Sequence, residues 1–391
     1  MAGSALRILG ISAALVAAAP LAMAQVPGVT KDTIKIGSFG PITGPNYLFG
    51  KLAMNGVEVV FDDVNAQGGI HGRKLQLVRE DDRCDPATAI AAVKKLIFQE
   101  QVFAINGGGC SNSAIAVREE VERAAMPWVV FAAVHDGITT PPAPTIFSTA
   151  LTSSIESAAQ VEFALAQGSK RIAVLSMKDS WGRARYTPLM EYFKKKGVTP
   201  VADEEIAPDA NDATAQVLKL RGANPDAIIM VVYPKPAAIF LRDAAKFAFK
   251  PLTVGQSGIA DPAAFEEQVA LPGATSNFVT ISQVRHIPTD PEMDKWRKAI
   301  EAKFPGDRLS VYNMFGIGSA QTLVEALKRA GPEPTREKFV TALQELKGFK
   351  TDTYGGLISC SATDHRCNKA PAWLKKEPGG PVKLVAVTPV E

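Results

Sequence analysis

The chain has 391 residues, which is too long for one ordinary core and suggests two domains or one large one. With 46% hydrophobic and 21% charged residues, the composition excludes a disordered protein. Its 43 basic and 40 acidic residues are well mixed and leave a net charge of +3. No basic block stands out, so neither nucleic acid nor an anionic membrane surface is expected as a partner.

Residues 1–24 have the pattern of a secretory signal peptide. Arg7 is the only charged residue among the first 30, and the apolar run that follows it ends in Ala22-Met23-Ala24. We predict cleavage after Ala24 and therefore export. A membrane anchor is the alternative, but the apolar run is short for the ~20 residues that a span requires.

From Ile34 the sequence alternates between apolar runs of strand length and stretches of helical length. Strands are predicted at IKIGSF, KLQLV, VFAI and WVVFAA. Helices are predicted near residues 47–66, at PATAIAAVKKLIFQ and at SNSAIAVREEVERAA. Nearly continuous apolar strands separated by helices indicate a parallel sheet covered by helices on both faces.

A second α/β unit follows the turn-rich segment HDGITTPPAPT and opens with the strand IFSTA and the helix SSIESAAQVEFALAQG. Its further strands are predicted at RIAVLSM, VTPVADEEI, DAIIMVVY and PLTVGQ, and its further helices at WGRARYTPLMEYFKKKG, DATAQVLKLRG and PAAIFLRDAAKFAF. Residues 291–347 are mostly helical, and a few short strands ending in VKLVAV follow. The helices form either an extra domain or a return to the first unit, and the pattern leaves both open.

The four cysteines are expected to form disulfides, because an oxidising compartment permits them. Cys360 and Cys367 lie seven residues apart across a short loop. Cys84 and Cys110 each follow a predicted strand, so they are close if both strands end at one sheet edge. We predict the pairs Cys84–Cys110 and Cys360–Cys367. A metal site is not expected, because no C-x-x-C occurs and the histidines are scattered: His71, His135, His286 and His365.

The glycine run Gly107-Gly108-Gly109 lies between a predicted strand and a predicted helix, but it is not a nucleotide motif. A phosphate loop requires a lysine that is missing here, and Ser113 replaces the third glycine of a dinucleotide fingerprint. Ser111 is a plausible N-cap, and the unpaired amides after it would attract an anion. An ordinary capped helix explains these residues equally well.

Signals for catalysis are weak. GQSGIA departs from G-x-S-x-G because Ile259 replaces the last glycine. His135, beside Asp136, is a possible base, but no nucleophile is evident near it. We therefore predict no catalytic residue and no cofactor.

Three aromatic residues fall at turns or helix starts that follow predicted strands: Phe49, Trp181 and Tyr233. In open α/β sheets, that edge is where ligands bind. Local packing is the alternative for each ring.

The stretch from GPITGPNYLFG to EDDRCDP, followed by GGGCSNSA, resembles the leucine/isoleucine/valine-binding family of periplasmic substrate-binding proteins. The signature is N-x-x-G-G-I-x-G before a strand, then D-D-x-C-D-P and a second cysteine. The resemblance implies two doubly wound α/β lobes joined by three crossover segments, with the last helices completing the first lobe. The implied division is 1–24 signal peptide, 25–149 and 281–367 lobe 1, and 150–280 and 368–391 lobe 2.

The resemblance also implies a ligand site in the cleft between the lobes. It places the ligand carboxylate at the helix start near Gly109 and Ser111, and the family's disulfide matches Cys84–Cys110. The other positions that it implies are an aromatic of the first lobe, a backbone contact and two aromatics of the second lobe: Phe49, Ala133, Trp181 and Tyr233.

Two positions depart from the family pattern. Val134 replaces a threonine that helps to hold a ligand ammonium group, and Ser257 stands where the acidic partner of that group is expected. A buried ammonium without a carboxylate is costly. The departures favour an organic acid without an amine, such as a benzoate or a phenylpropanoid. Arg183 and Arg285 are candidates for a second charge contact.

The predicted protein is a monomeric periplasmic solute-binding protein that delivers a small-molecule carboxylate to an ABC permease of the inner membrane. The alternatives are a branched-chain or other amino-acid-binding protein, a periplasmic ligand sensor, and an exported enzyme that uses His135.

Overall fold

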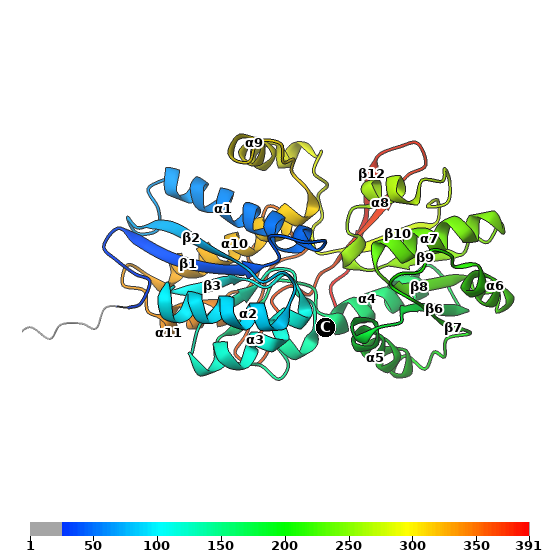
Figure 1. Cartoon of the computed structure of the whole chain (residues 1–391), viewed down its shortest axis with the longest axis horizontal. Helices are drawn as coiled ribbons and strands as arrows, with labels where there is room; N and C mark the ends of the chain where they lie inside the picture. The colour runs from blue at the N-terminus through cyan, green and yellow to red at the C-terminus, as the bar shows by residue number, and fades with distance from the viewer. Residues whose placement is uncertain (1–25, 391) are drawn as a thin grey trace, which may run out of the picture.

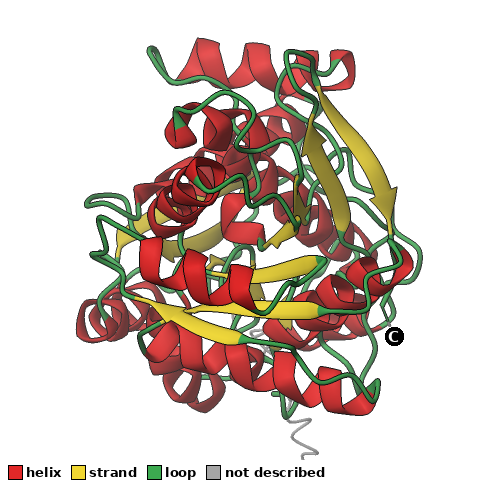
Figure 2. Cartoon of the chain, turned by 90° about the vertical axis from the view of Figure 1, so that its right-hand side faces the viewer, coloured by secondary structure: helices red, strands yellow, loops and turns green. Residues whose placement is uncertain are grey.

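The computed structural model describes residues 26–390. Figure 1 shows two α/β lobes side by side along the long axis of the molecule. Figure 2, which looks onto the end of the second lobe, shows helices on both sides of the strands. The predicted fold of two doubly wound α/β lobes is confirmed.

The first lobe contains a five-stranded parallel sheet with the order β2-β1-β3-β4-β5. Its strands are β1 (Thr33–Gly40), β2 (Lys74–Asp81), β3 (Ala104–Gly107), β4 (Trp128–Val130) and β5 (Ile146–Ser148). The helices that connect the first four strands are α1 (Lys51–Ala66), α2 (Pro86–Lys94) and α3 (Ser111–Arg123).

The second lobe contains a seven-stranded sheet with the order β12-β11-β10-β9-β8-β6-β7. Its strands are β6 (Ile172–Met177), β7 (Asp203–Ile206), β8 (Ala227–Val231), β9 (Leu252–Gly255), β10 (Phe278–Ser282), β11 (Ala372–Lys376) and β12 (Val382–Val387). Its helices are α4 (Ser153–Ala166), α5 (Ser180–Lys195), α6 (Thr214–Gly222), α7 (Pro234–Lys246) and α8 (Pro262–Val269). The pairs β10–β11 and β11–β12 are antiparallel, and the other pairs of this sheet are parallel. β6 and β8 are buried along their whole length, as their apolar sequences predict.

The helices of the last third return to the first lobe, which decides between the two alternatives. They are α9 (Asp294–Lys303), α10 (Val311–Ala330) and α11 (Arg336–Gln344). α10 packs directly against α1, and a Cβ atom on Gly316 would lie only 1.8 Å from the carbonyl oxygen of Ala53. The Asn313 side chain also donates to the Leu52 carbonyl at 2.8 Å.

Two elements differ from their predicted extents: one helix is divided, and one strand ends early. The helix expected over 47–66 is divided into a short 3-10 helix, η1 (Tyr47–Phe49), and α1, because the Lys51 amide donates to Pro41 at the break. The strand expected over WVVFAA ends at Val130. Two residues further on, the amides of Ala132 and Ala133 both donate to the Gly108 carbonyl instead of continuing the ladder.

Both predicted disulfides are present. The Cα atoms of Cys84 and Cys110 are 5.5 Å apart, and those of Cys360 and Cys367 are 4.5 Å apart. The first disulfide ties the turn after β2 to the residue before α3, and therefore fixes the start of that helix against its neighbour.

The chain crosses between the lobes after β5, after β10 and before β11. The lobe boundaries implied by the resemblance stay a prediction, and β10 runs across one of them. Within residues 26–390, no helix is both long and apolar enough to span a membrane. The predicted signal peptide lies outside this range.

Candidate ligand-binding cleft

A cleft with a free volume of about 550 Å³ lies between the two lobes. It is lined by loops and helix starts that follow the carboxyl ends of strands in both lobes. Seven of the eight residues predicted for the ligand site line it together: Phe49, Gly109, Ser111, Val134, Trp181, Tyr233 and Ser257. Their contact with a ligand stays a prediction.

The eighth residue, Ala133, does not line the cleft. It is buried, while its neighbour Ala132 faces the cleft in its place. The reason is the early end of β4, since both alanine amides turn toward Gly108.

One end of the cleft is formed by the start of α3. The N-cap position is Cys110 rather than Ser111, because the chain at Cys110 is extended and the helix begins at Ser111, one residue earlier than a cap at Ser111 would give. No side chain caps this end within the described chain. The first amide bonded within the helix is that of Ala114, which donates to Cys110 at 2.9 Å. The amides of the first turn are therefore available donors at the positive end of the helix dipole.

Two contacts hold the α3 start in place. The Ser111 hydroxyl oxygen accepts a hydrogen bond from the Val134 amide at 3.2 Å, so these two predicted residues brace each other. Gly109 lies against η1, and a Cβ atom at this position would meet the Phe49 carbonyl oxygen at 2.7 Å. A glycine at position 109 therefore lets the loop that carries Phe49 approach the helix start.

A buried carboxyl group lies in the turn that the first disulfide closes. Asp82 accepts a hydrogen bond from the Cys84 amide at 2.8 Å and is fully buried. Burial raises the pKa of Asp82 to about 6, against the opposing effect of the Cys84 amide, and the nearby Asp81 and Asp85 contribute to the rise.

Aromatic rings cover both faces of the cleft. Trp181 and Tyr233, in the second lobe, have ring centroids 4.5 Å apart and planes inclined by 30°. In the first lobe, Phe49 packs edge-on against Tyr312, with centroids 5.3 Å apart. Tyr312 comes from α10, far along the chain, and its hydroxyl donates to Gly258 of the other lobe at 3.3 Å. No local sequence pattern indicates Tyr312, because the position of α10 beside the cleft depends on contacts between distant elements.

The phenol of Tyr233 faces a carboxylate. Burial, together with the charge and hydrogen bond of Asp179, raises the pKa of Tyr233. Asp179 also caps α5 by accepting from the Gly182 amide at 2.7 Å. The Asp179 carboxylate is therefore hydrogen-bonded to two groups of the protein, the Tyr233 phenol and the Gly182 amide.

A buried ion pair that was not predicted from the sequence lies behind Ser257. Ser257 begins the short 3-10 helix η4 (Ser257–Ile259). Its hydroxyl donates to one oxygen of Glu156, and its amide donates to the other at 3.3 Å. Glu156 is fully buried and also pairs with Arg185.

The surface of the cleft carries almost no charge. Within the described chain, no aspartate or glutamate lines it, and Lys235 is its one charged residue. An ammonium group bound there would find no carboxylate in direct contact, whereas a carboxylate would find free amides at α3.

The arginines proposed for a second charge contact do not line the cleft. Arg183 is exposed on α5, and Arg285 donates to the His286 ring at 3.1 Å. His286 belongs to a cluster with Asp290 and Glu292 whose ligand atoms lie within 4.8 Å of one another. The Arg285 guanidinium beside that cluster disfavours a metal cation.

The histidine considered as a base has a structural role. His135 accepts a hydrogen bond from the Gly137 amide at 3.0 Å and caps a short 3-10 helix. Asp136 accepts from the amide and hydroxyl of Ser154 at the start of α4. His135 thus acts within its own turn, and Asp136 joins the loop after β4 to the start of α4.

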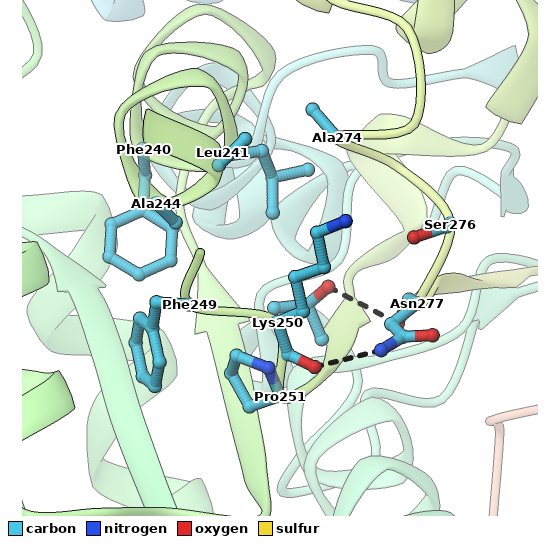
Figure 3. Close-up of a pocket in the computed structure, with 11 residues that line it drawn as sticks. Phe240, Leu241, Ala244, Phe249, Lys250, Pro251, Ala274, Ser276 and Asn277 are labelled. Carbon is cyan, nitrogen blue, oxygen red and sulfur yellow. Dashed lines mark hydrogen bonds between the residues drawn. The ribbon is translucent and has the colours of Figure 1, made fainter. Parts of the chain in front are cut away.

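A second hollow lies at the far end of β9 in the second lobe (Figure 3). It is lined by Phe240, Phe249 and Lys250, and the Asn277 side chain closes it by donating to the Lys250 carbonyl at 2.7 Å. Its free volume of about 10 Å³ is that of a single water. Two larger hollows, of about 510 and 430 Å³, each lie within a single lobe, whereas the cleft of about 550 Å³ is lined by residues of both lobes.

Comparisons with known proteins agree with this geometry. The model of the family described as periplasmic binding protein matches residues 33–376. A leucine-, isoleucine-, valine-, threonine-, and alanine-binding protein of Pseudomonas aeruginosa is 25% identical over 323 residues, covering 82% of this chain and 84% of the relative.

Two solved structures share the fold. The substrate-binding protein of a branched-chain amino acid transporter from Streptococcus pneumoniae, in complex with isoleucine, is 22% identical with a TM-score of 0.75, covering 92% of this chain and 99% of that one. A fatty acid ABC transporter substrate-binding protein from Thermomonospora curvata is 22% identical with a TM-score of 0.76, covering 94% and 95%.

Proposed function

Because the chain belongs to the periplasmic binding protein family, we propose that it is the periplasmic solute-binding protein of an ABC importer. Its ligand is a small organic carboxylate that lacks an amine, with an aromatic acid of the benzoate or phenylpropanoid type favoured. The lobes close over the bound acid, and the closed form docks on the permease. The relatives above are named as binding proteins, which supports this role over an enzymatic one.

The observation that carries the proposal is the contrast between the two ends of the cleft. The uncapped start of α3 offers free amides to an anion, and such a site contributes about 0.3–2 kcal/mol from the helix dipole alone. The opposite wall presents Ser257 and the two mutually tilted rings of Trp181 and Tyr233, with no acidic side chain at the surface. A buried ammonium left without a partner costs several kcal/mol, so an α-amino acid is disfavoured.

The dimensions of the cleft support a ligand of this class. A free volume of about 550 Å³ falls within the usual range of about 300–1,000 Å³ for small-molecule sites. The rings of Trp181, Tyr233 and Phe49 provide faces for an aromatic ligand, and each stacked pair adds roughly 0.5–1.5 kcal/mol beyond area burial.

An amino-acid-binding protein is the second candidate. It is favoured by the names of the relatives, two of which refer to branched-chain amino acids. Under this alternative, an acid just behind the wall, Glu156 or Asp179, would have to reach the ligand's ammonium group. A periplasmic sensor would use the same closing lobes, and uptake by a deletion strain separates sensing from transport.

Ligands matched in shape separate the two candidates. We would compare 3-phenylpropionate with phenylalanine, and 4-methylpentanoate with leucine, by thermal shift and titration calorimetry. Within each pair only the amino group differs. We expect the acid of a pair to raise the melting temperature and the amino acid to leave it unchanged. A shift with leucine or phenylalanine and none with the amine-free acids would overturn the proposal.

A further inference from the structure

Resting on the proposed function, we propose that Arg185 determines the charge selectivity of the cleft from behind its wall. Arg185 neutralises Glu156, the carboxylate that would otherwise attract a ligand's ammonium group. The protein therefore has an acid at the wall but does not present it to the ligand.

The first step is the position of Glu156. It lies in the first turn of α4 and is fully buried. Both of its oxygens accept hydrogen bonds from Ser257, one from the hydroxyl and one from the amide. Since Ser257 lines the cleft, the carboxylate is one hydrogen bond away from a bound ligand.

The second step is the position of Arg185. It lies on α5, is 2% exposed, and donates to a Glu156 oxygen at 2.5 Å. Its guanidinium carbon lies 5.3 Å from the centroid of the Trp181 ring, another wall of the cleft. The ion pair thus extends behind the wall from Ser257 to Trp181.

The third step is the unequal bonding of the two partners. Both oxygens of Glu156 are satisfied by Ser257 and Arg185. Two nitrogens of Arg185, Nε and Nη1, have no hydrogen-bond partner within the described chain. The contacts of Arg185 are therefore its bond to Glu156 and its packing on Trp181. They do not form the wider hydrogen-bond network that a purely structural arginine would have.

Together these contacts make the wall electrostatically neutral toward a ligand. A cation in the cleft would be attracted by Glu156 and repelled by Arg185, which lies beside Glu156. Removing the positive partner alone should convert the wall into an ammonium site, without any change in the residues that line the cleft.

The test uses the matched ligands 3-phenylpropionate and phenylalanine with the mature full chain. In Arg185→Met, phenylalanine should gain at least tenfold in affinity relative to 3-phenylpropionate. Arg185→Lys keeps the charge and should keep the wild-type preference. The double variant Glu156→Gln/Arg185→Met removes both charges and should also return to the wild-type preference. The selectivity ratio is the readout, because a purely structural role would lower the affinity for both ligands alike.

Arg185→Met leaves a buried carboxylate unpaired and is at risk of misfolding. Glu156→Gln provides the second arm. It leaves Arg185 as the uncompensated charge, so phenylsuccinate, which has an additional carboxylate, should gain at least tenfold over 3-phenylpropionate.

The outcomes separate this inference from the proposed function. A wild-type protein that prefers phenylalanine, or that binds neither ligand, overturns the proposed function and the inference with it. A wild-type protein that prefers the amine-free acid, together with an unchanged ratio in folded Arg185→Met, overturns the inference alone. If Arg185→Met does not fold, an unchanged phenylsuccinate ratio in Glu156→Gln overturns it.

Discussion

Replacing Ser111 with proline deletes one free amide from the start of α3 and tests whether that end of the cleft binds the ligand's carboxylate. Proline is well tolerated at the first position of a helix, where its missing N–H has no helical partner. The residue before a proline must be extended, and Cys110 has φ −108° and ψ 134°. The helix should therefore form normally in Ser111→Pro.

The expected loss follows from the type of hydrogen bond removed. A hydrogen bond to a charged group contributes about 1.5–3 kcal/mol. Losing one from the complex should raise the dissociation constant by about 10- to 150-fold. The helix dipole and the neighbouring amides remain, so binding should be weakened and not abolished.

Ser111→Ala is the matched control. Both substitutions remove the hydroxyl that accepts from the Val134 amide at 3.2 Å, but alanine keeps the N–H at position 111. Because that bond is internal to the protein, its loss should lower the free energy of unfolding by about 1 kcal/mol in both variants, so it does not affect the comparison of their affinities.

The assay is titration calorimetry of 3-phenylpropionate with both variants, accompanied by thermal unfolding without ligand to show that each is folded. The proline variant should bind at least tenfold more weakly than the alanine variant. Equal affinities in two folded variants would refute the placement of the carboxylate at α3.

Three further predictions concern the cleft, a buried acid and the packing of the last helices. Trp181→Leu should weaken 3-phenylpropionate about tenfold in calorimetry through loss of ring stacking, and an unchanged affinity would place the ring of the ligand elsewhere. The folded state binds the proton of Asp82 more tightly than the unfolded chain, because burial raises its pKa from 3.8 to about 6. The free energy of unfolding should thus fall by at most about 3 kcal/mol as the pH rises from about 4 to 6. Asp82→Asn should remove this pH dependence in urea titrations. An equal fall of the unfolding free energy in the variant would contradict the raised pKa of Asp82. Gly316→Ala should lower the melting temperature by several degrees, since the added methyl meets the Ala53 carbonyl oxygen at 1.8 Å. Gly222→Ala, at the open end of α6, is the matched control and should leave the melting temperature nearly unchanged.

Most of the fold follows from local pattern. The strands of both lobes are short apolar runs, and the helices between them have matching lengths, so alternation alone indicates two parallel sheets. The Cys84–Cys110 disulfide follows as well, because the ends of β2 and β3 lie at one edge of the same sheet. The helix start at α3 was placed within one residue, and only the cap was wrong, since the disulfide holds Cys110 extended.

The residues that sequence reasoning missed are those that depend on contacts between distant elements. Tyr312 reaches the cleft because α10 returns to pack on α1, and no local pattern encodes that return. Glu156 and Arg185 lie on different helices, 29 residues apart, and each alone has the sequence context of an ordinary surface helix. The position aligned with an acid in the family is Ser257, so the residue pattern indicates a missing carboxylate. The structure instead shows a carboxylate bonded to that serine from behind.

The hidden pair changes how selectivity in this cleft should be understood. Two unit charges roughly 6 Å apart interact by about 3 kcal/mol at an effective dielectric constant near 20. Glu156 alone would thus favour an ammonium group by an amount comparable to the desolvation cost that otherwise excludes it. Arg185, bonded to Glu156 at 2.5 Å, contributes a repulsion of similar size and cancels most of this gain. The discrimination between an acid and its amino-acid analogue then depends on a residue that does not line the cleft, and a comparison of lining residues alone would attribute it to Ser257.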